Sequence, residues 1–240
     1  MLTDEIANDP VKDGTGQGHL FLLAQPQASR PDMPLGLVGT TNWNTRMQQL
    51  AMRAHPGELN TLPEAIPRLL DTNSYRRARG AARATSNLSE GRIFVPNPMM
   101  TGAIELQVFE DCGLRLFFSR LTVNLTGDEV FISDPATVSL TRRFLAVAEE
   151  ASYVGPWSLA IGGTGLHKLQ AAPDHTRFAT TARYSDEEYR QATAVTWAEL
   201  TEAPGAVTRR LLGPLLRSPA IEYRYDEMLT DATPDIGQQL

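Results

Sequence analysis

The chain has 240 residues, of which 42% are hydrophobic and 21% are charged. These are the proportions of a globular protein that is long enough to bury a substantial core. No apolar run approaches the roughly 18 residues needed to cross a bilayer, and the acidic N-terminus lacks the apolar segment of a secretory signal. The single cysteine, Cys112, excludes an internal disulfide framework. We therefore predict a cytoplasmic protein without membrane association.

The net charge of −6 is concentrated at the two ends of the chain. Residues 1–13 carry a net charge of −3 and residues 218–240 a net charge of −4, which leaves the middle at +1. Both ends are also poor in apolar residues, so we expect residues 1–18 and 218–240 to be flexible acidic tails. Residues 19–217 are expected to form one domain, with a candidate sub-boundary near 89–102.

The basic residues are almost all arginine: of 22, only Lys12 and Lys168 are lysines. The codon usage of a GC-rich genome produces such a bias, and the abundance of alanine, glycine and proline favours this explanation. The alternative is selection for planar, bidentate contacts with anions, which arginine makes better than lysine.

The first half of the chain mixes predicted helices and strands. The apolar run 19–25 predicts a buried strand, and the apolar spacing over 43–54 predicts a helix that Asn42 can cap. A second helix is expected at 62–70, where two prolines weaken the pattern. Three strands are then predicted, with tight turns between them, at 103–109, 114–123 and 129–133.

The clearest helix spans 136–153, where Asp134 can cap the start and Phe144 lies in the middle of the apolar stripe. Strands are predicted next at 157–161, 176–183 and 189–196. Thr196 and Glu199 then form a capping-box pattern at the start of another helix.

The last predicted helix spans 204–217, and Pro214 should bend it or end it early. Strands joined by tight hairpins favour an antiparallel sheet, and the long amphipathic helices need a surface to cover. We therefore predict an α+β fold with a largely antiparallel sheet, helices on one face, and a more helical N-terminal part.

Residues that could carry catalysis or hold a metal are sparse. Cys112 follows two acidic residues, whose negative charge disfavours a reactive thiolate. The spacing of the histidines fits no zinc motif, and none lies three or four residues from another: His19, His55, His167 and His175. We expect no metal site, no catalytic residue and no cofactor. The sequence leans away from an enzyme without deciding the question.

The first candidate binding motif is Gly162-Gly163-Thr164-Gly165, directly after a predicted strand, with Lys168 nearby. Consecutive glycines let backbone N–H groups form a concave nest for a phosphate. The motif lacks the full spacing of a P-loop or of a dinucleotide-binding fingerprint. A phosphate site and a plain turn or bulge therefore both remain open.

The second candidate is a run of four arginines without an acidic residue, within residues 72–89: Arg76, Arg77, Arg79 and Arg83. Such a run can contact the phosphates of a nucleic acid weakly and without sequence preference. It can equally be the solvated face of a helix.

The C-terminal third of the chain resembles a known family. The segment Tyr189–Arg217, with the sequence YRQATAVTWAELTEAPGAVTRRLLGPLLR, is similar to the end of actinobacterial proteins that carry a Schlafen-type AlbA-like domain. The same region is matched by Phe144–Leu166, which contains YVGPW and TGL, and more loosely by His19–Ala24 followed by Arg30-Pro31-Asp32. Proteins of this family are described as DNA-binding or ATP-binding.

The similar segments correspond to the accessory region that follows the AlbA-like domain, and that domain itself is not recognisable in the chain. The resemblance implies a stand-alone or truncated accessory domain and transfers no functional residue.

We therefore expect a non-catalytic binding or assembly domain that works with a protein partner or a second copy, with weak nucleic-acid contact as a further expectation. The alternative is a phosphate-ligand or nucleotide-binding protein, or an enzyme, built around Gly162–Lys168. A ligand site should be a pocket into which the amides of Gly162–Gly165 point, whereas an assembly domain should expose an apolar patch.

Overall fold

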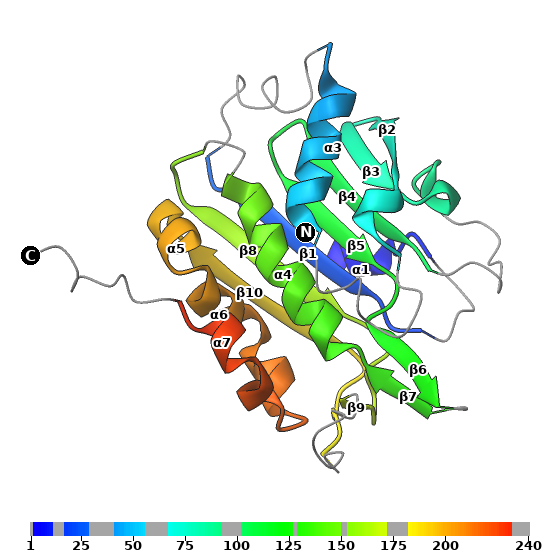
Figure 1. Ribbon diagram of the computed structural model, residues 1–240, viewed down its shortest axis with the longest axis vertical. Coiled ribbons are helices and arrows are strands. Elements are labelled where there is room, and N and C mark those ends of the chain that lie inside the picture. Colours follow the sequence, from blue (N-terminus) through cyan, green and yellow to red (C-terminus); the bar gives the residue numbers. More distant parts are fainter. Residues whose placement is uncertain are drawn as a thin grey trace, which may run out of the picture.

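The computed structural model describes residues 2–11, 17–28, 41–55, 67–92, 102–126, 129–149, 153–171 and 182–231. A layer of helices covers one face of a largely antiparallel sheet (Figure 1), which confirms the α+β fold class. The expected excess of helix in the N-terminal part is not confirmed. The two longest described helices, α4 (Asp134–Glu149) and α6 (Pro204–Arg217), belong to the second half of the chain.

Seven strands form the main sheet in the order β10-β8-β1-β5-β4-β3-β2, and every neighbouring pair is antiparallel. The strands are β1 (Leu20–Pro26), β2 (Asn73–Arg77), β3 (Gly80–Ala84), β4 (Ile104–Phe109), β5 (Leu114–Phe118), β8 (Trp157–Gly163) and β10 (Tyr189–Val195). β1 lies inside the sheet between β8 and β5, and its Leu20 pairs with Phe118 of β5 on one side and with Gly163 of β8 on the other.

A small second sheet holds β6 (Thr122–Thr126), β7 (Glu129–Ile132) and β9 (Gln170–Ala171). The single strand predicted over 114–123 is therefore wrong at its C-terminal end, because the chain leaves the main sheet after Phe118. The N–H of Ala103 donates to Ser119 Oγ at 2.6 Å, and the N–H of Leu121 donates to the carbonyl of Gly18 at 2.9 Å. These bonds to distant segments turn the chain away from the main sheet after Phe118, although the alternation of residues that predicts a strand continues to residue 123.

The helical layer consists of α3 (Trp43–Ala54), α4 and α6, which pack side by side, with the short helices α5 (Trp197–Glu202) and α7 (Asp226–Leu229) beside α6. Their apolar stripes bury Met47, Phe144 and Leu212 against Leu22 and Leu116 of the sheet. The capping box predicted at Thr196 and Glu199 is confirmed. No helix in the described ranges is long and apolar enough to span a membrane.

One further helix, α1 (Leu2–Ala7), packs on the opposite face of the sheet, so the helices are not confined to one face. Leu2 and Ile6 contact a second, smaller core that includes Phe21 and Phe117. The sequence pattern misses α1 because a helix of six residues gives too few turns for a periodic signal.

Both chain ends contribute to the fold, so the expected tails are wrong for the described residues 2–11 and 218–231. At the N-terminal end, Val11 is buried together with the side chains that α1 covers. At the C-terminal end, Ile221 is 1% exposed and Leu229 is 2% exposed, because η4 (Glu222–Tyr225) and α7 dock on α6. A few well-placed apolar residues thus outweigh the acidic composition.

Several other predictions concern segments between the main elements. Strands β3 and β4 pair directly although they lie on either side of the candidate sub-boundary at 89–102. The predicted elements at 62–70 and 176–183 fall largely outside the described residues. Where the structure does describe these regions, it shows η2 (Leu69–Asp71) and, before the sub-boundary, η3 (Ser86–Leu88).

Phe144 provides a test of the helical layer, because its side chain is 2% exposed in the middle of the α4 stripe. We expect Phe144→Ala to lower the free energy of unfolding by about 3–5 kcal/mol, since the substitution removes buried surface and leaves a cavity. Urea denaturation measures this change. Met52, which is 60% exposed on α3, gives the control Met52→Ala, for which the change should stay within about 0.5 kcal/mol. A change below about 1 kcal/mol for Phe144→Ala would contradict the packing described here.

Candidate functional site

The glycine motif does not form a phosphate nest in the described structure. Gly162 and Gly163 lie inside β8 and pair with β1 on one side and with β10 on the other. The N–H of Thr164 donates to the carbonyl of His19 at 3.0 Å, and the Thr164 hydroxyl accepts the N–H of His19 at 3.1 Å. Because these groups belong to the sheet, they do not converge on a ligand.

Close packing explains the glycines. A Cβ added at Gly162 would lie 2.9 Å from the terminal carbons of Ile6 and Leu2, so a larger residue would require the ends of these two α1 side chains to shift. Gly165 has a φ of +67° and lies against the backbone of Gly18, which favours glycine on both grounds. Lys168 is exposed, and its backbone N–H donates to the carbonyl of Tyr184.

The four arginines of the run belong to the β2–β3 hairpin, which the sequence pattern does not predict, and they do not share a face. Arg76 lies under α3, with its guanidinium 4.3 Å from the ring centroid of Trp43. Arg83 donates to the hydroxyls of Thr72 and Ser74, and burial lowers its pKa.

The other two arginines lie elsewhere on the hairpin. Arg79 is exposed in the turn between the two strands. Arg77 points to the opposite face of the sheet from Arg76, since neighbouring residues in a strand alternate. The run therefore forms no continuous basic surface on the described hairpin.

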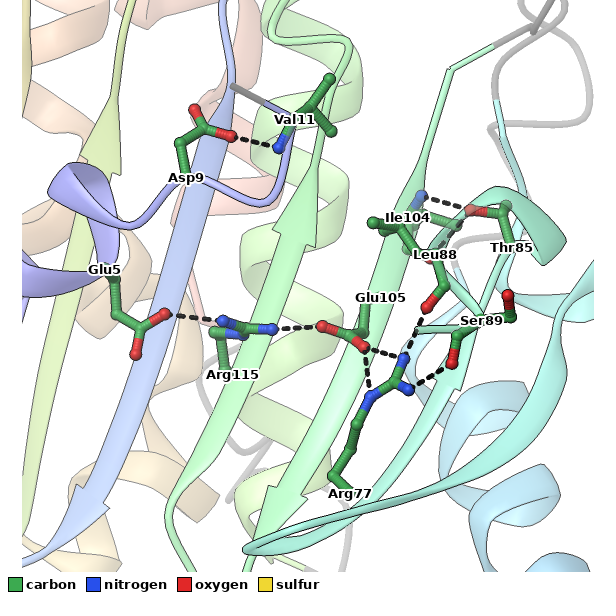
Figure 2. A network of polar contacts seen from close by, with 10 residues as sticks. All are labelled: Glu5, Asp9, Val11, Arg77, Thr85, Leu88, Ser89, Ile104, Glu105 and Arg115. Carbon is green, nitrogen blue, oxygen red and sulfur yellow. Dashed lines mark hydrogen bonds and ion pairs between the residues drawn. The ribbon is translucent and has the colours of Figure 1, made fainter. Parts of the chain in front are cut away.

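Arg77 instead ends a chain of four alternating charges across the second face of the sheet, in the order Glu5, Arg115, Glu105 and Arg77 (Figure 2). The Nη2 and Nε atoms of Arg77 donate to Glu105 Oε1 at 2.7 and 3.1 Å. Arg115 donates to Glu105 Oε2 and, at 2.7 Å, to Glu5 Oε2 of α1. The side chain of Glu105 is fully buried.

The chain of charges is internally balanced. Burial by itself would lower the pKa of Arg115, but the attraction of Glu105 and Glu5 outweighs burial and raises it. The remaining Arg77 donors reach the carbonyls of Leu88 and Ser89 at 2.7 and 2.6 Å. Apart from the buried Nε atom of Arg115, which has no hydrogen-bond partner, the donors of both arginines bond inside the fold. These charges therefore hold β2, β4, β5 and α1 together and are not placed to meet a ligand.

A feature that can bind another molecule is the outer edge of β10, which is one of the two end strands of the sheet, with β2 at the opposite end (Figure 1). The backbone bonds from Thr164 to His19 and from Gln27 to Pro156 fix which β8 residues face β1. Since backbone direction alternates along a strand, the N–H and C=O groups of Arg190, Ala192 and Ala194 then point away from β8. The sequence predicts this strand but not its place in the sheet.

Two side chains that could react, those of Cys112 and His19, are enclosed. Cys112 is buried in a turn with a φ of +63°. The Nδ1 atom of His19 lies 2.5 Å from Asp9 Oδ2, and the imidazole is buried against Phe117. Within the described ranges, no group of three or more His, Cys, Asp or Glu side chains could hold a metal ion.

Glu105 tests the chain of charges. Glu105→Gln keeps the shape of the side chain but leaves two largely buried arginines without their shared counter-charge. We expect the free energy of unfolding to fall by about 3–5 kcal/mol, because breaking a buried ion pair leaves an uncompensated charge. Glu110→Gln, at an exposed position one residue past the end of the same strand, is the matched control. Equal effects of the two variants in guanidinium denaturation would show that the network does not stabilise the fold.

Comparison of the chain with protein-family models, with curated proteins and with solved structures found no match.

Proposed function

We propose that the chain is a non-catalytic assembly domain, which pairs with a second copy of itself through the outer edge of β10. The observation that carries this proposal is the row of backbone groups on Arg190, Ala192 and Ala194, which pair with no strand among the described residues. Such an edge is a ready template for another strand.

The edge lacks most of the devices that usually block strand addition, and Arg190 is its one charged residue. β10 pairs with β8 over seven consecutive residues without a bulge, and the strand contains neither proline nor lysine. Ala192 and Ala194 are exposed and small, so a neighbouring backbone can approach closely. The Ala194 carbonyl also accepts the Thr193 hydroxyl at 3.3 Å, which leaves its second lone pair for a partner.

The edge is also self-complementary. A two-fold axis at Ala192 sets this residue opposite itself and sets Arg190 opposite Ala194 of the second copy. Because all three residues face outward, each copy contributes three N–H donors and three C=O acceptors. The two Arg190 side chains are then four residues apart along the strands, roughly 14 Å, so that their repulsion is weak.

The arrangement of Arg190 favours this pairing. Its guanidinium contacts Glu188 Oε2 at 2.5 Å and the Thr3 hydroxyl of α1 at 3.4 Å. The side chain therefore lies over the second face of the sheet, where it does not cover the backbone edge.

Other routes to a partner have less support. The large apolar side chains exposed in the described structure come from four separate segments: Met52, Leu70, Val154 and Tyr223. The role of an accessory domain beside a nucleic-acid-binding protein, which the family resemblance implies, is compatible with self-assembly and stays a separate proposal. Charge reversal at Arg77 is a poor test of that role, because the substitution also breaks the contact with Glu105.

A proline at position 192 tests the assembly. Ala192→Pro removes an N–H that makes no bond inside the described sheet, so the fold should persist while strand addition is blocked. We expect sedimentation velocity to show a concentration-dependent dimer for the wild type and a monomer for Ala192→Pro, with unchanged far-ultraviolet circular dichroism. Ala192→Ser, which keeps the N–H and nearly the same size, should dimerise like the wild type.

Two results would overturn this proposal: a wild type that stays monomeric at every concentration, and a proline variant that dimerises as well as the wild type does.

A further inference from the structure

A depression of about 460 Å³ lies on the helical layer, between α4, the first turn of α6, and α7. Ser139, Arg142 and Arg143 of α4 form one wall, and Pro204, Glu227 and Met228 form the other. This volume lies in the range of small-molecule sites in proteins, roughly 300–1,000 Å³. The depression is separate from the β10 edge and does not depend on the assembly proposed above.

The α4 wall presents donors suited to an anion. Ser139, Arg142 and Arg143 are spaced three and four residues apart, so they share one face of the helix. Their two guanidinium groups and one hydroxyl can contact several oxygens of a single phosphate group.

Arg142 differs from the arginines of the charge network in its lack of a counter-charge. Its Nη1 atom is buried and has no hydrogen-bond partner, and neither Arg142 nor Arg143 forms an ion pair with any residue in the described ranges. Because this atom has almost no solvent-accessible surface, it does not itself face the open depression. What Arg142 offers a ligand is the positive charge of the side chain that lines the wall, which no ion pair with a described residue offsets.

The surrounding charges limit what the depression can take. Among the described residues that line the depression, Glu227 is the single acidic one, against two arginines. Arg53 adds a third positive charge near the rim, since its Nε atom donates to the carbonyl of Ala146 at 2.9 Å. The N-terminal amides of α6 are already occupied, because Gly205 and Ala206 donate to Asp231 at 2.6 and 2.9 Å. Side chains alone would therefore bind the anion.

We infer that this depression is a binding site for a phosphate group, either free or carried by a small molecule. The depression would bind the same class of ligand as the phosphate site that the sequence offers at Gly162–Lys168. It lies on the helical layer and not along β8, and it uses different residues. The sequence gives little sign of this site. From sequence alone, Arg142 and Arg143 are expected on the solvated side of an amphipathic helix, and only the structure places α7 opposite them.

Isothermal titration calorimetry with inorganic phosphate and with AMP, in a buffer of low anion content, tests this inference. We expect both probes to bind the wild type and Arg142→Gln to weaken binding roughly tenfold to a hundredfold, as for loss of a charged hydrogen bond. Glu227→Gln should strengthen binding, because it removes a repulsive charge from the opposite wall. Arg79→Gln makes the same change of charge as Arg142→Gln, at an exposed position in the turn between β2 and β3, and should leave the affinity unchanged.

The two probes distinguish the source of the phosphate. Equal affinities would indicate a site for the free ion, and tighter binding of AMP would indicate a phosphorylated small molecule; both results support the inference. The inference would be overturned if neither inorganic phosphate nor AMP bound to the wild type. It would also be overturned if a folded Arg142→Gln variant kept the wild-type affinity, or if Glu227→Gln failed to strengthen binding.

Discussion

The charge of Glu105 is the constraint on which the second face of the sheet depends. A carboxylate with no access to water is tolerated only when ion pairs and hydrogen bonds replace its hydration. Arg77 and Arg115 supply both from opposite sides of β4, and each then needs further partners of its own. Arg115 finds Glu5 and Arg77 finds two carbonyls near η3, so one buried charge fixes the positions of four separate segments.

This network also gives the arginine-rich composition a structural meaning. Arg77 uses Nε and both Nη atoms at once, in a planar fork that bridges a carboxylate and two carbonyls. A lysine ammonium carries one nitrogen and could not span these acceptors. Codon usage can supply arginine throughout the chain, but at this position the geometry requires it.

The sequence pattern was enough to predict the elements that depend on residues close together in the chain. The stripe around Phe144, the strand at 189–196 and the capping box at Thr196 all follow from spacing within a few residues. Features that depend on distant contacts could not be predicted in this way. The end of β5 is set by bonds to other segments, and the partition of the arginine run depends on Glu105 and Trp43.

The candidate sites follow the same division. The alternation of residues in β10 predicts a strand, but its place at the end of the sheet can be known only from the order of all the strands. The depression on the helical layer exists only because α7 docks, and the acidic composition of that segment predicts a tail. In both cases the site comes from the arrangement of elements, which a single sequence without a recognised relative does not encode locally.

The position of β1 between β8 and β5 has a consequence for how the chain folds during synthesis. One of its neighbours, β8, is synthesised long after β1, so Leu20 cannot pair with Gly163 until then. Contacts between residues so far apart in sequence slow folding, since the loop must close before the pairing stabilises it. Until then one edge of an apolar strand, with Leu22 and Leu23 among its residues, has no partner. Molecular chaperones that hold exposed strands should therefore improve the yield of this protein more than conditions that stabilise its finished fold.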